Sequence, residues 1–126
     1  MKILVIDDDE MIRESICDLL EMEDFQIISA NNGLSGVELA HEHLPDLVVC
    51  DINMPKLGGH EVLSRLRQNS STNQIPFMFL TAYSDDENRD LALRMGANAY
   101  LTKPLSARNL LEKISMLLSF PLQHLY

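Results

Sequence analysis

Short apolar runs alternate with longer amphipathic segments along the whole chain. The apolar runs predict β-strands, and they lie at residues 2–6, 25–29, 46–50, 75–80 and 98–102. Between them, apolar residues recur at helical spacing, as Ile12, Ile16 and Leu19 do. These segments predict helices at residues 10–21, 34–43, a stretch following Gly59, 85–95 and a stretch following Pro104.

Five strands alternating with five helices are typical of an α/β protein with a doubly wound parallel sheet. All the strands except the second are almost wholly apolar, as strands covered on both faces should be. We therefore predict a five-stranded parallel sheet in the flavodoxin-like strand order 2-1-3-4-5, joined by right-handed crossovers. We expect one domain over residues 1–120, with residues 121–126 forming a tail or the start of a linker.

The composition fits a single globular domain, because 46% of the 126 residues are hydrophobic. Nineteen acidic residues against ten basic ones give a net charge of −9, so we expect no direct binding of nucleic acid by this domain. The first apolar run is too short for a signal peptide or a membrane span. Cys17 and Cys50 lack a CxxC spacing, and we expect two reduced, buried thiols in a cytoplasmic protein.

Four of the predicted strands end at residues suited to phosphoryl chemistry. Because the carboxyl ends of parallel strands lie along one edge of a sheet, these residues should gather there. In the predicted order the first and third strands are neighbours about 5 Å apart, which would bring Asp7 or Asp8 near Asp51. Carboxylates at so short a distance repel one another unless a cation lies between them, and Mg²⁺ is the usual hard divalent ion.

A lysine and a hydroxyl complete this predicted site. Lys103, after the fifth strand, supplies a positive charge for a phosphoryl oxygen, and Thr81, after the fourth, supplies a hydroxyl donor. Each residue also has a simpler explanation when taken singly. These are helix capping by Asp8, Asp9 or Glu10, a loop acid at Asp51, a helix cap at Thr81 and a solvated lysine at Lys103. They do not explain why four strand ends carry such residues together.

The chain resembles the receiver domain of bacterial two-component response regulators over residues 1–119. The matching stretches are ILVIDDD (3–9), DINMP (51–55) with Gly59, FLTA (79–82) and GANAYLTKP (96–104). All four occur in order at the family's spacings, so the resemblance is specific. It implies a chemotaxis-regulator-like fold and a phosphorylation-dependent switch. Such a protein assists its own phosphorylation and dephosphorylation and is not a turnover enzyme.

The resemblance also implies the chemistry of the site. Asp51 would accept a phosphoryl group from a phosphohistidine of a sensor histidine kinase or a phosphotransfer protein. Asp7, Asp8 and Asp51 would hold Mg²⁺ together with the main-chain carbonyl of Asn53. Lys103 would pair with the carboxylate and then with the phosphoryl group.

The switch is likewise implied by the resemblance. Thr81 would move to the phosphoryl oxygen, Tyr100 would swing inward behind it, and the Lys103–Pro104 peptide would be cis. The surface of the fourth helix, fifth strand and fifth helix would then act on a downstream effector protein or domain, with a phosphorylation-induced homodimer as one output. Gly58 stands where the family often has a polar helix cap, which predicts a loose start to the third helix.

Two other classes of function remain open on the sequence. A phosphatase that forms an aspartyl-phosphate commonly needs a second acid two residues after the nucleophile, and Asn53 cannot supply one. A protein-interaction module on the same scaffold would work without phosphorylation. Such a module would not need all five of the key side chains.

Overall fold

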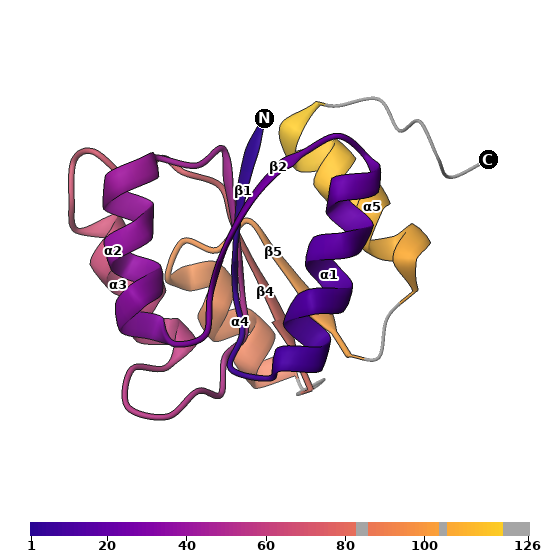
Figure 1. The fold of residues 1–126 in the computed structure, drawn as a ribbon. Coiled ribbons are helices and arrows are strands. Elements are labelled where there is room, and N and C mark those ends of the chain that lie inside the picture. Colours follow the sequence, from indigo (N-terminus) through magenta and orange to yellow (C-terminus); the bar gives the residue numbers. More distant parts are fainter. Residues whose placement is uncertain (83–85, 104–105, 120–126) are drawn as a thin grey trace.

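A five-stranded parallel sheet lies between two layers of helices (Figure 1). The computed structural model describes residues 1–82, 86–103 and 106–119. The strands are β1 (Lys2–Ile6), β2 (Gln26–Ala30), β3 (Leu47–Cys50), β4 (Phe77–Thr81) and β5 (Ala99–Thr102). The helices are α1 (Glu10–Met22), α2 (Gly33–His43), α3 (Gly59–Arg67), α4 (Asp86–Arg94) and α5 (Ala107–Leu118). All strand pairings are parallel and the order is β2-β1-β3-β4-β5, which confirms the predicted flavodoxin-like α/β fold.

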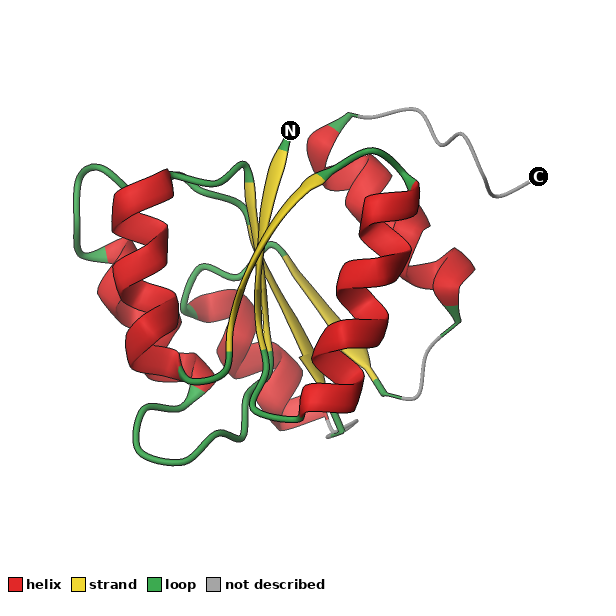
Figure 2. Ribbon diagram, viewed as in Figure 1, coloured by secondary structure: helices red, strands yellow, loops and turns green. Residues whose placement is uncertain are grey.

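The helices are divided between the two faces of the sheet. Helices α1 and α5 cover one face, and α2, α3 and α4 cover the other (Figures 1 and 2). Successive side chains of β1 enter opposite cores: Ile3 and Val5 pack on the side of α1 and α5, and Leu4 and Ile6 on the other side. Because both faces are covered, β3 and β4 are buried throughout, as their apolar sequences predict.

Four strands begin later than the sequence predicts: β2, β3 and β5 by one residue, and β4 by two. Strand β2 begins at Gln26, because the amide of Phe25 still bonds to the carbonyl of Leu20 at the end of α1 (3.3 Å). Strand β4 begins at Phe77, because the amide of Ile75 closes a turn onto the carbonyl of Thr72 (3.1 Å). An apolar run therefore extends beyond the residues that join the ladder.

Every other boundary that the sequence predicts within the described residues differs from the observed one by no more than one residue. Helix α2 begins at Gly33, because the Asn32 side chain accepts a hydrogen bond from the amide of Ser35 (2.8 Å) and caps the helix. Gly33 thus begins the helix one residue before the predicted start at residue 34. The predicted start of the fourth helix at Asp85 lies outside the described residues, as does the predicted tail, 121–126.

Gly59 lies where α3 packs against the loop that follows β3. Its amide donates to the carbonyl of Ile52 (2.8 Å), and a Cβ at this position would overlap the main-chain oxygen of Asp51 and contact Phe79. The preceding residue, Gly58, is the N-cap of α3 and provides no side-chain hydrogen bond, and the loose start of this helix stays a prediction. The close approach at Gly59 fixes how α3 sits against the loop after Asp51.

We predict that Gly59→Ala lowers the free energy of unfolding by about 1–3 kcal/mol, because a well-packed region must move to admit the methyl group. Urea denaturation measures the difference. Gly58→Ser is the matched control, since it adds a capping hydroxyl where there is more room, and its stability should lie within a few tenths of a kcal/mol of the parent. Equal stability of the parent and Gly59→Ala would contradict the packing described here.

Candidate functional site

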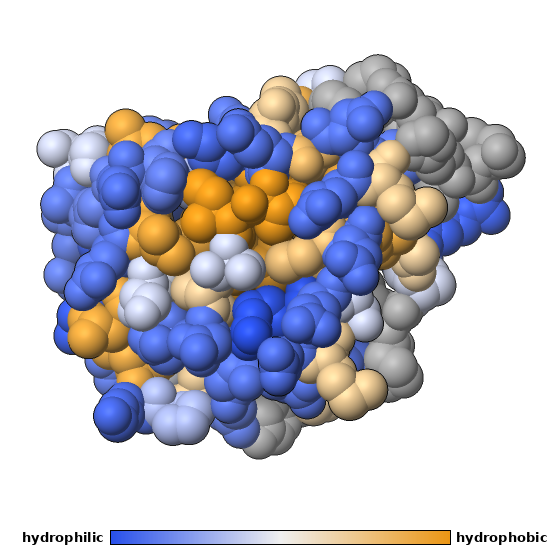
Figure 3. All heavy atoms as spheres, viewed as in Figure 1, coloured by the Kyte–Doolittle hydropathy of each residue, from blue (hydrophilic) through white to orange (hydrophobic). Residues whose placement is uncertain are grey.

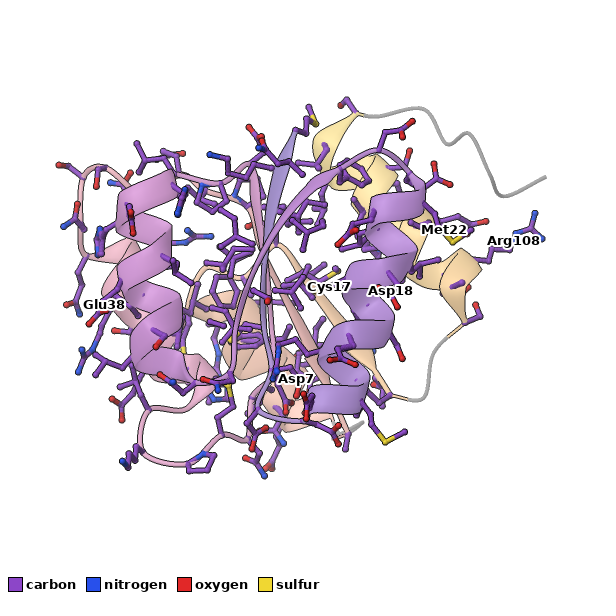
Figure 4. All side chains as sticks on the ribbon, viewed as in Figure 1. Asp7, Cys17, Asp18, Met22, Glu38 and Arg108 are labelled. Atoms are coloured by element: carbon purple, nitrogen blue, oxygen red, sulfur yellow. The ribbon has the colours of Figure 1, made fainter. Side chains whose placement is uncertain are left out.

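The carboxyl ends of β1, β3, β4 and β5 meet along one edge of the sheet. The register places Ile6 opposite Cys50 and Thr81 opposite Thr102, so the residues that follow these strands are neighbours. Asp7 lies at this edge, just beyond β1 (Figure 4). The structure therefore brings the predicted strand ends together.

Asp7, Asp8 and Asp51 form a cluster of three carboxylates. One oxygen of each lies within 4.8 Å of the others. The side chains of Asp7 and Asp51 are 3% and 12% exposed, whereas Asp8 is open to solvent. Buried carboxylate oxygens beside one accessible acid fit a hard divalent cation such as Mg²⁺, which takes carboxylate, carbonyl and water ligands.

Lys103 lies against both of the buried carboxylates. Its Nζ is 3.0 Å from Oδ2 of Asp7 and 3.6 Å from Oδ2 of Asp51, and its side chain is 17% exposed. Its main-chain amide donates to the carbonyl of Thr81 (2.6 Å), which ties β5 to the end of β4. These contacts exclude the solvated surface lysine that the sequence allowed. Three carboxylates and one ammonium leave two formal negative charges, the number that a divalent cation balances.

Main-chain amides orient the two buried carboxylates. The amide of Asp9 donates to Oδ1 of Asp7 (2.9 Å), and the amide of Ile52 donates to Oδ1 of Asp51 (2.8 Å). In each carboxylate the other oxygen, Oδ2, is the one that lies nearest Lys103. The cluster is thus held by the backbone on one side and by an ammonium on the other.

Asp9 caps helix α1, which is one of the alternative roles that the sequence allows for Asp8, Asp9 and Glu10. Its side chain accepts a hydrogen bond from the amide of Ile12 (3.1 Å) and forms the N-cap of α1. Asp8 is therefore not needed as the cap. The guanidinium of Arg13 donates to the main-chain oxygen of Asp7 (2.8 Å), a contact that the sequence did not suggest, because an arginine on an amphipathic helix normally indicates a solvated face.

The environment of Asp51 disfavours its charged form. Burial raises the pKa of the Asp51 carboxyl, the Lys103 ammonium lowers it, and the carboxylate of Asp7 raises it again. The amide of Ile52 lowers the pKa and Asp8 raises it, both with smaller effects. A cation placed among these acids would favour the ionised, nucleophilic form of Asp51.

The two predicted switch residues are both buried, on two of the strands that lead to this edge. Thr81 is the last residue of β4 and its side chain is inaccessible. Tyr100, on β5, is 7% exposed and its ring centre lies 6.4 Å from that of Phe79. It therefore already occupies an inward position here. The guanidinium of Arg89, on α4, lies 5.8 Å from the centre of the Tyr100 ring, a cation–π contact that sequence reasoning missed.

Asn53 and Pro104 carry the two remaining predictions about the site. Asn53 is exposed in the loop after β3, and its main-chain carbonyl as a metal ligand stays a prediction. The predicted cis peptide between Lys103 and Pro104 falls on a residue outside the described ranges.

The prediction of two buried thiols is correct for Cys50 and wrong for Cys17. Cys50 lies within the sheet, where burial raises the pKa of its thiol well above the ordinary value and Asp51 and Asp7 add to the effect. Cys17 is half-buried, because it lies on α1 beside β2, the last strand of the sheet on that side. Both are free thiols.

Comparisons with known proteins agree with this architecture. A family model described as the response regulator receiver domain matches residues 3–115. The chain is 40% identical over 117 residues to the transcriptional regulatory protein CpxR homolog of Haemophilus influenzae, covering 93% of this chain and 50% of that protein. It is 38% identical over 122 residues to the uncharacterized 14.6 kDa protein in the sodA1 3' region of Leptolyngbya boryana, covering 96% and 93% of the two chains.

Solved structures show the same likeness. The chain matches the chemotaxis protein CheY4 of Vibrio cholerae with a TM-score of 0.88 and 26% identity, covering 92% of this chain and 97% of that one. This chain spans about half the length of several transcriptional regulators that it matches.

Proposed function

The chain belongs to the response regulator receiver domain family, whose members are signalling switches and not turnover enzymes, and from that premise we propose that Asp51 is its phosphoryl acceptor. The donor is a phosphohistidine on a sensor histidine kinase or a phosphotransfer protein. The observation that carries the proposal is the position of Lys103, whose ammonium contacts both Asp7 and Asp51 within a cluster of three carboxylates.

In the proposed reaction, an oxygen of the Asp51 carboxylate attacks the phosphorus of the donor. The bond between phosphorus and the imidazole nitrogen breaks, the imidazole leaves with the electron pair and takes up a proton, and an acyl phosphate remains on Asp51. The amide of Ile52 holds Oδ1, so Oδ2 is the proposed attacking oxygen beside Lys103. The Lys103 ammonium stabilises the charge on the phosphoryl oxygens.

Mg²⁺ is the proposed cofactor of this site. Phosphorylation replaces the singly charged carboxylate of Asp51 by an acyl phosphate that carries about −1.5 to −2 charges, and the bound cation would neutralise this added negative charge. Asp7, Asp8 and Asp51 would hold the ion, with the main-chain carbonyl of Asn53 as the remaining protein ligand. The close grouping of the three carboxylates supports this assignment.

We predict that Asp8→Asn weakens Mg²⁺ binding by about tenfold or more, because one charged ligand becomes neutral. Asp8 is exposed, so the substitution should leave the fold intact. Asp9→Ser is the matched control, since it removes a neighbouring charge but keeps a good N-cap for α1. Calorimetric titration with Mg²⁺ measures both variants. A larger loss of Mg²⁺ affinity in Asp9→Ser than in Asp8→Asn would show that the proposed metal ligands are wrong.

The proposed signal is a change in the surface formed by α4, β5 and α5. Thr81 ends β4 and Tyr100 lies on β5, both are buried, and a switch there needs two packings that differ by only a few kcal/mol. Several relatives named as transcriptional regulators are about twice as long as this chain, which favours an effector outside it, either a domain or another protein. A phosphorylation-induced homodimer is one output of this kind, and the net charge of −9 argues against nucleic-acid contacts by this domain itself.

A cytoplasmic location is part of the proposal. Both cysteines are free thiols, which suits a reducing compartment. No helix in the described part of the chain is long and apolar enough to cross a membrane.

One incubation separates the three classes of function. The protein is mixed with a small phosphodonor such as acetyl phosphate, with Mg²⁺ or with a chelator. The switch predicts a single adduct that is stable in acid, labile in base and dependent on Mg²⁺. Turnover of many donor equivalents without an accumulating adduct would favour a phosphatase, and the absence of any reaction would favour a module that works without phosphorylation.

A further inference from the structure

Strand β2 leaves one edge of the sheet open. It is the end strand of the order β2-β1-β3-β4-β5, and no strand of the described ranges pairs with its outer side. The amide of Gln26 and the carbonyl of Ala30 bond towards the β1 side. Ile27 and Ser29 occupy the alternate positions, so their main-chain N–H and C=O groups face outward.

An apolar strip follows this open edge. Figure 3 shows hydrophobic atoms over β2, between the hydrophilic surfaces of α1 and α2. The strip consists of half-buried side chains: Ile27 and Cys17 on the side of α1, and Ile28 and Leu39 on the side of α2. Edge strands normally carry a charge, a proline or a bulge that blocks further pairing. Strand β2 (QIISA) has no charge and no proline, and its register with β1 is unbroken.

Acidic side chains border the strip. Burial raises the pKa of the Cys17 thiol in the strip, and the nearby charges of Glu21, Asp18 and Glu14 on α1 raise it further, whereas Arg13 lowers it. The guanidinium of Arg13 is already bonded to the main-chain oxygen of Asp7. Cys17 points from α1 towards β2, with Asp18 beside it (Figure 4). The open edge is therefore apolar along its centre and negative along its border.

We propose that the β2 edge binds an extended segment of a partner protein, which adds a strand to the sheet and carries apolar side chains flanked by lysine or arginine. The outward main-chain groups of Ile27 and Ser29 would bond to that segment, the strip would take its apolar side chains, and the acids of α1 would pair with its basic ones. This surface is formed by the edge strand and does not include Asp51, so the inference stands apart from the proposed function.

Electrostatics disfavours a second copy of this chain as the occupant. Two β2 edges joined antiparallel about a two-fold axis would set α1 of one copy beside α1 of the other. Glu14, Asp18 and Glu21 would then face the same residues, and each copy carries a net charge of −9. A basic segment meets attraction where a second copy meets repulsion.

The test is selection of short peptides from a displayed library on the immobilised full chain and on Ser29→Pro. This variant removes one outward N–H at an exposed position and leaves the bonds towards β1 in place, whereas Ser29→Thr keeps the N–H and serves as the control. The parent and Ser29→Thr should enrich basic peptides with alternating apolar residues. Ser29→Pro should bind the selected peptides about fivefold more weakly or worse. The amide NMR signals of Ile27 and Ser29 should shift on binding in the parent.

A second variant keeps the test decisive if Ser29→Pro fails to fold. Asp18→Lys should weaken binding of the selected peptides. Asp90→Lys, which makes an equal charge change on α4, should leave their binding unchanged. The proposal would be overturned if no peptides were enriched or if acidic peptides were enriched. It would also be overturned if the parent, Ser29→Pro and Asp18→Lys all enriched the same peptides equally. Sedimentation that shows a dimer of the parent, lost in Ser29→Pro, would overturn it in favour of a second copy.

Discussion

Asp51→Asn is expected to reduce phosphorylation by at least about a hundredfold, because the side-chain amide lacks a nucleophilic carboxylate oxygen. The substitution should leave the local structure in place, since the asparagine oxygen can still accept the hydrogen bond that the amide of Ile52 now donates to Asp51 (2.8 Å). Loss of phosphorylation would therefore report on chemistry and not on folding. The mass of the intact protein after incubation with Mg²⁺ and acetyl phosphate measures the adduct directly.

Asp9→Asn is the matched control for this experiment. It makes the same chemical change two residues beyond Asp7 and keeps a good capping side chain on α1. This variant should gain the phosphoryl group as the parent does. An equal mass gain in Asp51→Asn would mean that another residue is the acceptor.

Lys103→Ala is expected to slow phosphorylation by about 10²-fold and to uncouple it from the conformational change. The ammonium lies between the carboxylates of Asp7 and Asp51, where it would stabilise charge that develops on the phosphoryl oxygens. Its removal leaves Asp51 able to react in the presence of Mg²⁺. The acyl phosphate would then lack the partner through which β5 responds, because Lys103 directly follows that strand.

Amide NMR spectra recorded at equal degrees of phosphorylation measure this uncoupling. In the parent, the signals of Thr81 and Tyr100 should change when the phosphoryl group is added, and in Lys103→Ala these changes should be largely lost. Lys113→Ala, which removes a lysine from α5, should behave as the parent does. Parental shift changes in Lys103→Ala would remove Lys103 from its proposed role in the switch.

The five strands and the meeting of four strand ends at one edge could be predicted because apolar runs in parallel strands are strongly marked, and the strand order followed from the flavodoxin-like fold that the alternation indicates. The run that ends in Asp51, for example, is apolar on both faces because helices cover both faces of β3. Strand starts were less well predicted, because a local hydrogen bond decides them. The turn that the amide of Ile75 makes onto Thr72 holds an apolar residue outside the ladder.

Within the site, residue types were predictable but the division of labour among them was not. Aspartates at positions 7, 8 and 9 are all able to cap a helix or bind a metal, and only the hydrogen bond from Ile12 to Asp9 assigns the cap. The contacts of Arg13 and Arg89 depend on long side chains whose positions are set by tertiary neighbours. The exposure of Cys17 depends on β2 being the end strand, which the amino-acid type of that residue cannot reveal.

The central claim is that Asp51 carries the phosphoryl group, and chemical mapping of the adduct tests it most directly. The phosphorylated parent is reduced with borohydride, which converts an aspartyl phosphate to homoserine, and its peptides are sequenced by mass spectrometry. We predict homoserine at position 51 and aspartate at positions 7 and 8. Homoserine at position 7 or 8, or aspartate retained at position 51 in a protein that has gained the phosphoryl mass, would contradict the account.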